Sequence, residues 1–584
     1  MMLKEPLVAA GEENGVKKSD EAHHHHGNSL DRIGCFFGGL VRDYKLRFTK
    51  ENWATDFKYG LRWKTLSSAL FMFFATFAST VALGELIRRQ TNNRIGITEF
   101  LLMNSVAGMI HSLLGCQPLL VLRPTGPITA IITFISTLSD SFHFDFFLYL
   151  SWTGIFVGIY MFLIASTEMC RFIKLLTRFT HDIFAFFVCT IYIHDGLTGI
   201  IDRFDPDKMV DMATSLFATV LSIVTCAIAL CLHFNRSWKS LTKSTRSFLS
   251  DYALSLAVAF TVLISFTLQW GTSRIAQRLG RLVERVHVPS GFRPTCGFNA
   301  TFIGATVSCD DAMHTARPWF VGLSIDNARL PLVSAATALP IVFFFFMDQN
   351  VSSLLTQRKA VGLSKGSYYH SSFLCMAIFC CVGPLFGLPF VTGSLPHSPQ
   401  LAKALWSRKR YLRIQGETHA EEEAENDEPE VYENRIAPFI MYFLIGAVLL
   451  CPAIIETLPL ATIDAILFFV GVAGLFECEL WERLLLLCRH PKTFPIDKKY
   501  TKVSWKKMHG YTLLQIFLLG IAWAVQLSPA GLLFSVLICM LVPFRIWVVP
   551  LLFTPHELDM LDAPDEECCD ENVRQYSLAS SSAV

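Results

Sequence analysis

Long apolar runs separated by short polar stretches recur along the whole chain. Three examples are SSALFMFFATFASTVALGEL (67–86), FFLYLSWTGIFVGIYMFLIA (146–165) and MATSLFATVLSIVTCAIALCL (212–232). Each run holds about 20 residues, which as a helix is long enough to cross the roughly 30 Å of hydrocarbon in a bilayer. The pattern therefore predicts an all-α polytopic membrane protein.

The runs fall into two sets of seven segments, and each set contains one unusually short segment. We expect helices in the first set at 64–87, 98–115, 127–138, 146–167, 181–201, 210–234 and 249–271. In the second set we expect them at 328–348, 369–388, 399–407, 435–453, 457–476, 511–527 and 530–550.

Lysine and arginine in the short loops set the expected orientation, because such loops are enriched in basic residues on the cytoplasmic side. Loops 171–178, 236–246 and 356–365 are basic and fall on one side, whereas basic loop 88–94 is an exception. We therefore divide the chain as follows: a cytoplasmic N-terminal tail (1–60), a first transmembrane repeat (61–272), an extracellular loop (273–327), a second transmembrane repeat (328–550) and a cytoplasmic C-terminal tail (551–584). Within the second repeat, the acidic stretch 408–434 is expected to be a disordered cytoplasmic loop.

The extracellular loop carries the sequon Asn299-Ala300-Thr301 and two cysteines, Cys296 and Cys309. A sequon outside the cytoplasm is a glycosylation acceptor, and cysteines there meet an oxidising environment. We expect Asn299 to be glycosylated and Cys296 and Cys309 to be able to form a disulfide.

Composition agrees with the membrane assignment, since 52% of the residues are hydrophobic and 17% are charged, against about 25% charged in soluble domains. The net charge of +1 and the absence of a basic stripe argue against nucleic acid as a partner. No catalytic constellation occurs, so we do not expect an enzyme. No cluster of histidines and cysteines occurs either, so we expect no resident metal and no cofactor.

The two short segments begin in a similar way, with Pro124-Thr125-Gly126-Pro127 in the first and Pro396-His397-Ser398-Pro399 in the second. Interrupted segments at corresponding positions of two halves are the best sequence pointer to a transporter binding site. Backbone that is not helical at membrane depth must line a cavity or be buried, and a helix N-terminus favours anions. A proline-kinked structural helix is the alternative.

Several stretches resemble the solute carrier 4 family, the bicarbonate transporters and anion exchangers, including the borate transporters of plants and fungi. They are GCQPLL (115–120) with TGP (125–127), TRFTHDIF (177–184), FMDQ (346–349), KGSYYH (365–370), GLP (387–389), PFR (543–545) and LDMLDA (558–563). The resemblance implies fourteen segments in two inverted repeats of seven, with core and gate domains and half-helices at segments 3 and 10. It further implies a homodimer in the plasma membrane and elevator-type transport.

Five residues of the two breaks are candidates for binding the anion: Arg123, Thr125, Gly126, His397 and Ser398. Arg123 stands where the family usually has glycine, and His397 where many anion exchangers have arginine, so we expect Arg123 to supply the positive charge of the site. An arginine at that depth needs an anion or an acid as partner. The alternative is that Arg123 turns toward cytoplasmic water. Because histidine titrates near neutrality, His397 predicts a pH-dependent anion affinity.

Asp348 closes the apolar run IVFFFFMD, where an ionisable group is costly and functional by default. The resemblance implies that Asp348, Ser352 and Thr125 bind a coupling ion, sodium or a proton. Capping of a helix end is the alternative role of Asp348. Glu85 and the pair His194-Asp195 are further candidates, with an interfacial polar cluster as the alternative.

The sequence therefore predicts a secondary active transporter of a small inorganic anion, with lipid as its surroundings. Bicarbonate or carbonate is the first choice of substrate and borate the second. A channel-like pathway for protons or hydroxide is the rival from another class.

Overall fold

The computed structural model describes residues 34–562 except 59, 61, 207–210, 271–272, 287, 289–292, 296–299, 303–304, 308–316, 325–326, 359–360, 364, 409–428, 491–493, 495–497 and 529–530. Each of the fourteen predicted segments coincides with a helix. In the first set these are α4 (Trp63–Gln90), α5 (Ile97–Leu114), α6 (Gly126–Phe142), α7 (Phe146–Ser166), α8 (Arg178–Ile201), α9 (Met212–His233) and α11 (Ala253–Trp270). In the second they are α13 (Arg329–Thr356), α14 (His370–Leu385), α15 (His397–Ala404), α16 (Ile436–Val448), α18 (Leu460–Phe476), α20 (Trp505–Gln526) and α21 (Phe534–Trp547).

Shorter helices connect or flank these segments. They are α2 (Gly38–Arg47), α3 (Lys50–Lys58), α10 (Lys243–Asp251), α12 (Arg274–Arg281), α17 (Pro452–Glu456), α19 (Glu479–Leu486), α22 (Val549–Leu552) and α23 (Pro555–Leu561).

Among the described residues, eight helices are long and apolar enough to cross a membrane, and a ninth span results if α18 and α19, which are bent by 71°, count as one. The multi-pass helical architecture is thus confirmed. A layout of fourteen crossings stays a prediction.

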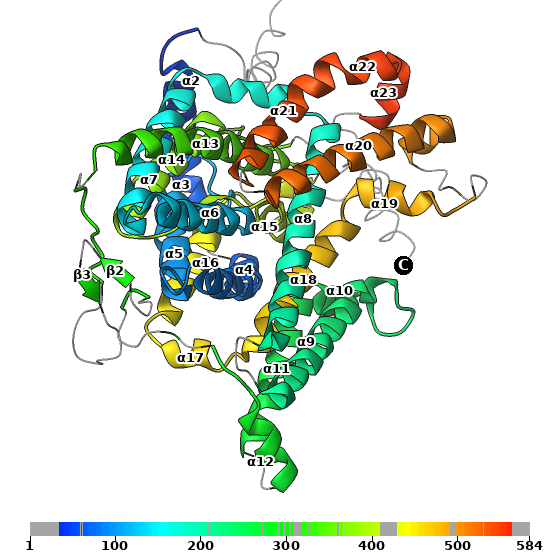
Figure 1. The fold of residues 1–584 in the computed structure, drawn as a ribbon. Coiled ribbons are helices and arrows are strands. Elements are labelled where there is room, and N and C mark those ends of the chain that lie inside the picture. The colour runs from blue at the N-terminus through cyan, green and yellow to red at the C-terminus, as the bar shows by residue number, and fades with distance from the viewer. Residues whose placement is uncertain are drawn as a thin grey trace, which may run out of the picture.

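Helices from the two halves of the chain are interleaved in two groups. In one group α7 packs against α13 and α14, and α4, α5 and α16 pack against one another. The half-helix α6 joins this group through α7 and α4, and α15 joins it through α13 and α4. In the other group α8 packs along α18, and α9 packs against α18 and α11. Figure 1 shows the first group on the left and the second on the right, with α8 at the boundary. Each group therefore needs both halves of the chain.

The described strands form three short antiparallel ribbons, of which β1 (Leu122–Arg123) with β4 (Thr392–Gly393) joins the two broken segments. Leu122 pairs with Gly393 and Arg123 with Thr392, and the ladder continues where Ser394 N donates to Val121 O at 2.7 Å. The other ribbons are β2 (Ala300–Phe302) with β3 (Ala305–Val307), and β5 (Trp406–Arg408) with β6 (Pro429–Val431). The ladder satisfies backbone groups that helices cannot satisfy at this depth, so the breaks are not proline kinks of continuous helices.

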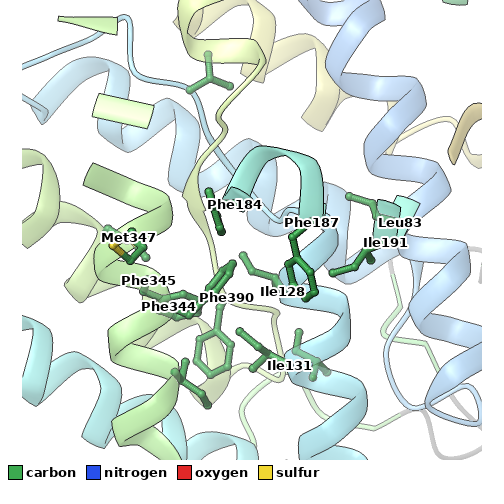
Figure 2. Packing of buried hydrophobic residues seen from close by; sticks show 14 of the residues in the cluster. Leu83, Ile128, Ile131, Phe184, Phe187, Ile191, Phe344, Phe345, Met347 and Phe390 are labelled. Atoms are coloured by element: carbon green, nitrogen blue, oxygen red, sulfur yellow. The ribbon is translucent and has the colours of Figure 1, made fainter. Parts of the chain in front are cut away.

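Apolar side chains from several helices pack around the start of α6. Figure 2 shows Ile128 and Ile131 of α6 close to Phe184, Phe187 and Ile191 of α8, with Phe344, Phe345 and Met347 of α13 and Phe390 beside them. This packing brings α6, α8 and α13 together close to the start of α6.

Helix α13 extends further than predicted. It ends at Thr356, whereas the predicted segment ended at 348. The helix was expected to end where the apolar run IVFFFFMD closes at Asp348. The polar residues Gln349 and Ser352 that follow are buried against the second break: Gly393 N donates to Gln349 Oε1 at 2.6 Å, and Ser352 Oγ donates to Ser394 O at 3.0 Å. Asp348 therefore lies inside the helix and does not cap its end.

Candidate functional site

The two half-helices begin at the β1–β4 ribbon. Gly126 is the first residue of α6, with Pro127 in its first turn, and His397 is the first residue of α15. Proline in the first turn lacks an N–H that the helix would leave unpaired anyway. The ribbon thus holds both helix starts beside Arg123.

Arg123 is buried, with 1% of its surface exposed. Its Nη1 donates to Ser79 Oγ of α4 at 2.7 Å and to His397 Nε2 at 3.2 Å, and its Nε donates to Pro124 O at 3.2 Å. No carboxylate pairs with it, and its Nη2 has no acceptor, among the residues that the structure describes. The alternative in which Arg123 turns toward water does not fit this burial.

The contacts of His397 define its tautomer. A guanidinium can only donate, so His397 Nε2 accepts from Arg123, and Nδ1–H donates to Ser394 Oγ at 2.8 Å. The imidazole is therefore neutral in this arrangement, since a charged ring would place two cations 3.2 Å apart. This geometry argues against the expectation that protonation of His397 tunes the site near neutral pH.

Asp348 is also buried, with 4% of its surface exposed. Its Oδ2 accepts from Thr392 Oγ1 at 2.6 Å and lies 3.5 Å from Thr125 Oγ1, while the two threonine hydroxyls are 3.3 Å apart. No lysine or arginine pairs with it in the described part of the chain. One carboxylate and two hydroxyls form an oxygen cluster of the kind that hard cations prefer.

Several other buried acids of the described residues have basic partners, whereas Asp348 has none. Examples are Glu99 with Arg317 at 3.0 Å, Asp182 with Arg483 at 3.0 Å, and Asp56 with Arg435 at 2.9 Å. An unpaired buried charge is costly, and such a group is neutralised by a proton or by a bound ion. Arg123 and Asp348 are thus suited to an anion and to a cation or proton, respectively.

Ser352 and Ser398, both predicted to bind ligands, belong to a chain of hydrogen bonds. Ser398 Oγ accepts from Val121 N at 2.9 Å and donates to Ser394 O at 2.8 Å, and Ser352 Oγ lies 3.1 Å from it. These hydroxyls tie α13 and α15 to the ribbon. In this arrangement Ser352 bonds to Ser394 and Ser398 and makes no hydrogen bond to Asp348.

Glu85 lies in a different cluster and does not contact Arg123. Its carboxylate accepts from Arg88 at 2.7 Å and from Arg89 at 3.1 Å, and Arg89 reaches Asp464 of α18 at 2.9 Å. Asp464 also accepts from Arg203 at 2.7 Å. This ionic network links α4 of one helix group to α18 and the end of α8 in the other.

His194 and Asp195 do contact each other, with 3.4 Å between Nδ1 and Oδ1. The His194 side chain is half exposed, and its ring lies 5.5 Å from that of Trp523. The structure does not bring this pair into contact with Arg123 or Asp348. Asn299, Cys296 and Cys309 lie outside the described residues, so glycosylation and the disulfide stay predictions.

The sequence did not point to three residues of the site: Ser79, Thr392 and Tyr192. The Tyr192 hydroxyl accepts from Gly126 N at 2.9 Å. A signal existed for Thr392, because Thr392-Gly393 repeats Thr125-Gly126. Ser79 and Tyr192 stand in ordinary apolar helical runs. Within the described residues, no group of three or more histidines, cysteines and acids could hold a metal ion.

A family model described as the HCO3− transporter integral membrane domain matches residues 35–214 and 204–566. Among curated proteins, the chain is 25% identical to anion exchange protein 3 of Mus musculus, covering 97% of this chain and 46% of that protein. It is 26% identical to the band 3 anion transport protein of Homo sapiens, covering 92% and 57%. The chain thus spans about half the length of the curated relatives it matches.

Two solved structures share the fold. The transmembrane domain of the cyanobacterial bicarbonate transporter BicA has a TM-score of 0.50 and 15% identity, covering 82% of this chain and 98% of that one. SLC26A9 has a TM-score of 0.50 and 10% identity, covering 94% and 73%. At these identities the likeness concerns the fold alone.

Proposed function

This chain belongs to the family of HCO3− transporter integral membrane domains, the solute carrier 4 family, and from that premise we propose that it carries a small inorganic oxyanion across the membrane. Bicarbonate or carbonate is the substrate that the family and the site favour. The proposed mode is secondary active transport by elevator-type alternating access, in which the group carrying α6 and α15 moves against the group carrying α8 and α18.

The burial of Arg123 without a carboxylate partner is the observation that carries this proposal. Arg123 is a buried guanidinium beside the starts of two half-helices, and no described carboxylate neutralises it. Helix N-termini favour anions, and a guanidinium can donate two parallel hydrogen bonds to a planar oxyanion. Its Nη2, which no described group engages, supplies a donor for that purpose.

Coupling is assigned to Asp348. Its carboxylate has hydroxyl neighbours and no basic partner among the described residues, which suits sodium or a proton as counter-charge. Thr125 contacts this carboxylate one residue before α6 begins, so the ion and the anion would occupy adjacent positions. Assembly as a homodimer and a location in the plasma membrane are proposals that rest on the family resemblance.

Flux in vesicles reconstituted with the purified chain tests the proposal. Bicarbonate uptake should saturate, accelerate when anion is present on the opposite side, and respond to a sodium or a pH gradient. Transport of borate in place of bicarbonate would assign the alternative substrate. Flux without saturation or acceleration by the opposing anion would instead indicate a channel-like pathway.

A further inference from the structure

Tyr192 of α8 reaches the start of α6 from the neighbouring helix group. Its hydroxyl accepts a hydrogen bond from Gly126 N at 2.9 Å, at the first amide of the half-helix. Tyr192 follows Ile191, which Figure 2 places in the apolar packing between α8 and α6. An N–H that could face a bound anion is therefore engaged by a side chain from across the boundary of the two groups.

The contact is close, and a side chain at position 126 would force Tyr192 to move. A Cβ atom there would lie 2.6 Å from Tyr192 Cζ and 2.9 Å from its hydroxyl oxygen, well inside van der Waals contact. Gly126, whose N–H donates to Tyr192, directly follows Thr125, whose hydroxyl lies 3.5 Å from Asp348 Oδ2. The Tyr192 hydroxyl thus stands at the start of the half-helix that carries the site.

The hydrogen-bonding capacity of a phenol decides what Tyr192 can do. When its oxygen accepts from Gly126, the O–H hydrogen still needs an acceptor. The described residues provide none, whereas an oxyanion held by Arg123 would. A halide, which is spherical, gains mainly from the positive field, but an oxyanion also gains from directed donors.

We propose that Tyr192 is a specificity-determining residue, which donates its O–H to a bound oxyanion and so favours oxyanions over halides. This inference rests on the proposed transport function. Because Tyr192 stands on α8 while Arg123 and Gly126 belong to the other helix group, the donor contacts the anion when the groups are arranged as in this structure. Movement of one group against the other would break both of its hydrogen bonds.

The test compares Tyr192→Phe with wild type in reconstituted vesicles, with chloride as a competitor of bicarbonate. The matched control is Tyr160→Phe, which removes the same atom on α7, where the hydroxyl donates to Ala335 O at 3.4 Å. We expect Tyr192→Phe to raise the KM for bicarbonate about tenfold, the size of one hydrogen bond to a charged group. The maximal rate should stay within about twofold, chloride should compete more effectively, and Tyr160→Phe should change neither parameter.

An unchanged KM in Tyr192→Phe, or equal effects of both variants, would overturn the inference and leave the proposed function intact. Wild type without saturable bicarbonate flux would overturn both. If the variant shows no measurable flux, bicarbonate binding is instead measured through the thermal unfolding of the purified protein. Bicarbonate should then stabilise wild type at about tenfold lower concentration than the variant, and equal concentrations would count against Tyr192.

Discussion

Arg123 Nη1 lies 3.2 Å from His397 Nε2, although the two residues are 274 positions apart in the chain. Each stands at the start of one broken segment, so the contact joins the two halves at the site itself. Since the guanidinium donates, the imidazole is a neutral acceptor. The positive charge at this position belongs to Arg123, and His397 orients it.

Substitutions of His397 should show whether this residue orients Arg123 or contributes a positive charge of its own. Glutamine can accept from Arg123 and donate to Ser394, so His397→Gln should keep bicarbonate KM within about threefold, and the pH profile between about 6 and 8 should match wild type. Leucine can do neither, and His397→Leu should raise KM about tenfold, since a buried donor loses its partner. Flux at several pH values checks both. A flatter profile in His397→Gln would show that the ring titrates.

Asp348→Asn should uncouple transport from its driving ion. An asparagine can still accept from Thr392 but cannot balance a cation or release a proton. Uptake driven by a sodium or pH gradient should fall at least about tenfold, while exchange of anion for anion persists. Asp140→Asn, which alters an exposed acid paired with Arg94, is the control. Equal gradient dependence in Asp348→Asn and wild type would remove Asp348 from the mechanism.

Asp464→Asn should destabilise the protein more than Arg89→Gln does. Asp464 is buried and accepts from both Arg89 and Arg203, so its replacement removes two ion pairs at once, although Arg89 keeps Glu85 and Arg203 keeps Glu284. After Arg89→Gln, by contrast, Asp464 keeps Arg203 and Glu85 keeps Arg88. Thermal unfolding in detergent should rank the Tm values wild type, Arg89→Gln, Asp464→Asn in falling order. The reverse order for the two variants would contradict the network.

Asp43 of α2 should make stability depend on pH. Its Oδ2 accepts from Ser371 N at 3.0 Å, at the start of α14, and burial raises its pKa from 3.8 to about 7. The folded state therefore binds a proton that the unfolded state has lost, so the free energy of unfolding should fall between pH 4 and 7 and level off above. Asp43→Asn should remove this contribution. Equal pH dependence of the Tm in variant and wild type would contradict the account.

The helices and the position of both breaks could be predicted from hydrophobic runs and prolines, because these patterns are local. Their pairing through Leu122 with Gly393 could not, since a two-residue ladder leaves no periodicity. The end of α13 was predicted too early because the apolar run IVFFFFMD closes at Asp348. Gln349 and Ser352 continue the helix beyond it, and they are polar because they bind the backbone of the second break.

Residues that act from neighbouring helices were the harder part of the site. Ser79 and Tyr192 are single polar groups in apolar runs, as many structural residues are, and only the packing of α4 and α8 brings them to Arg123 and Gly126. Glu85 shows the converse. Its position suggested a site, but two adjacent arginines, Arg88 and Arg89, engage it locally.

The central claim is that Arg123 supplies the positive charge that binds the transported anion, and a charge transfer tests it most directly. Bicarbonate flux is measured in reconstituted vesicles for wild type, Arg123→Gly and Arg123→Gly with His397→Arg, all checked for folding by size-exclusion chromatography. The account predicts that Arg123→Gly abolishes flux and that the second substitution partly restores it, because the new guanidinium starts from the residue that Arg123 now contacts. Flux of Arg123→Gly at the wild-type rate would contradict the claim.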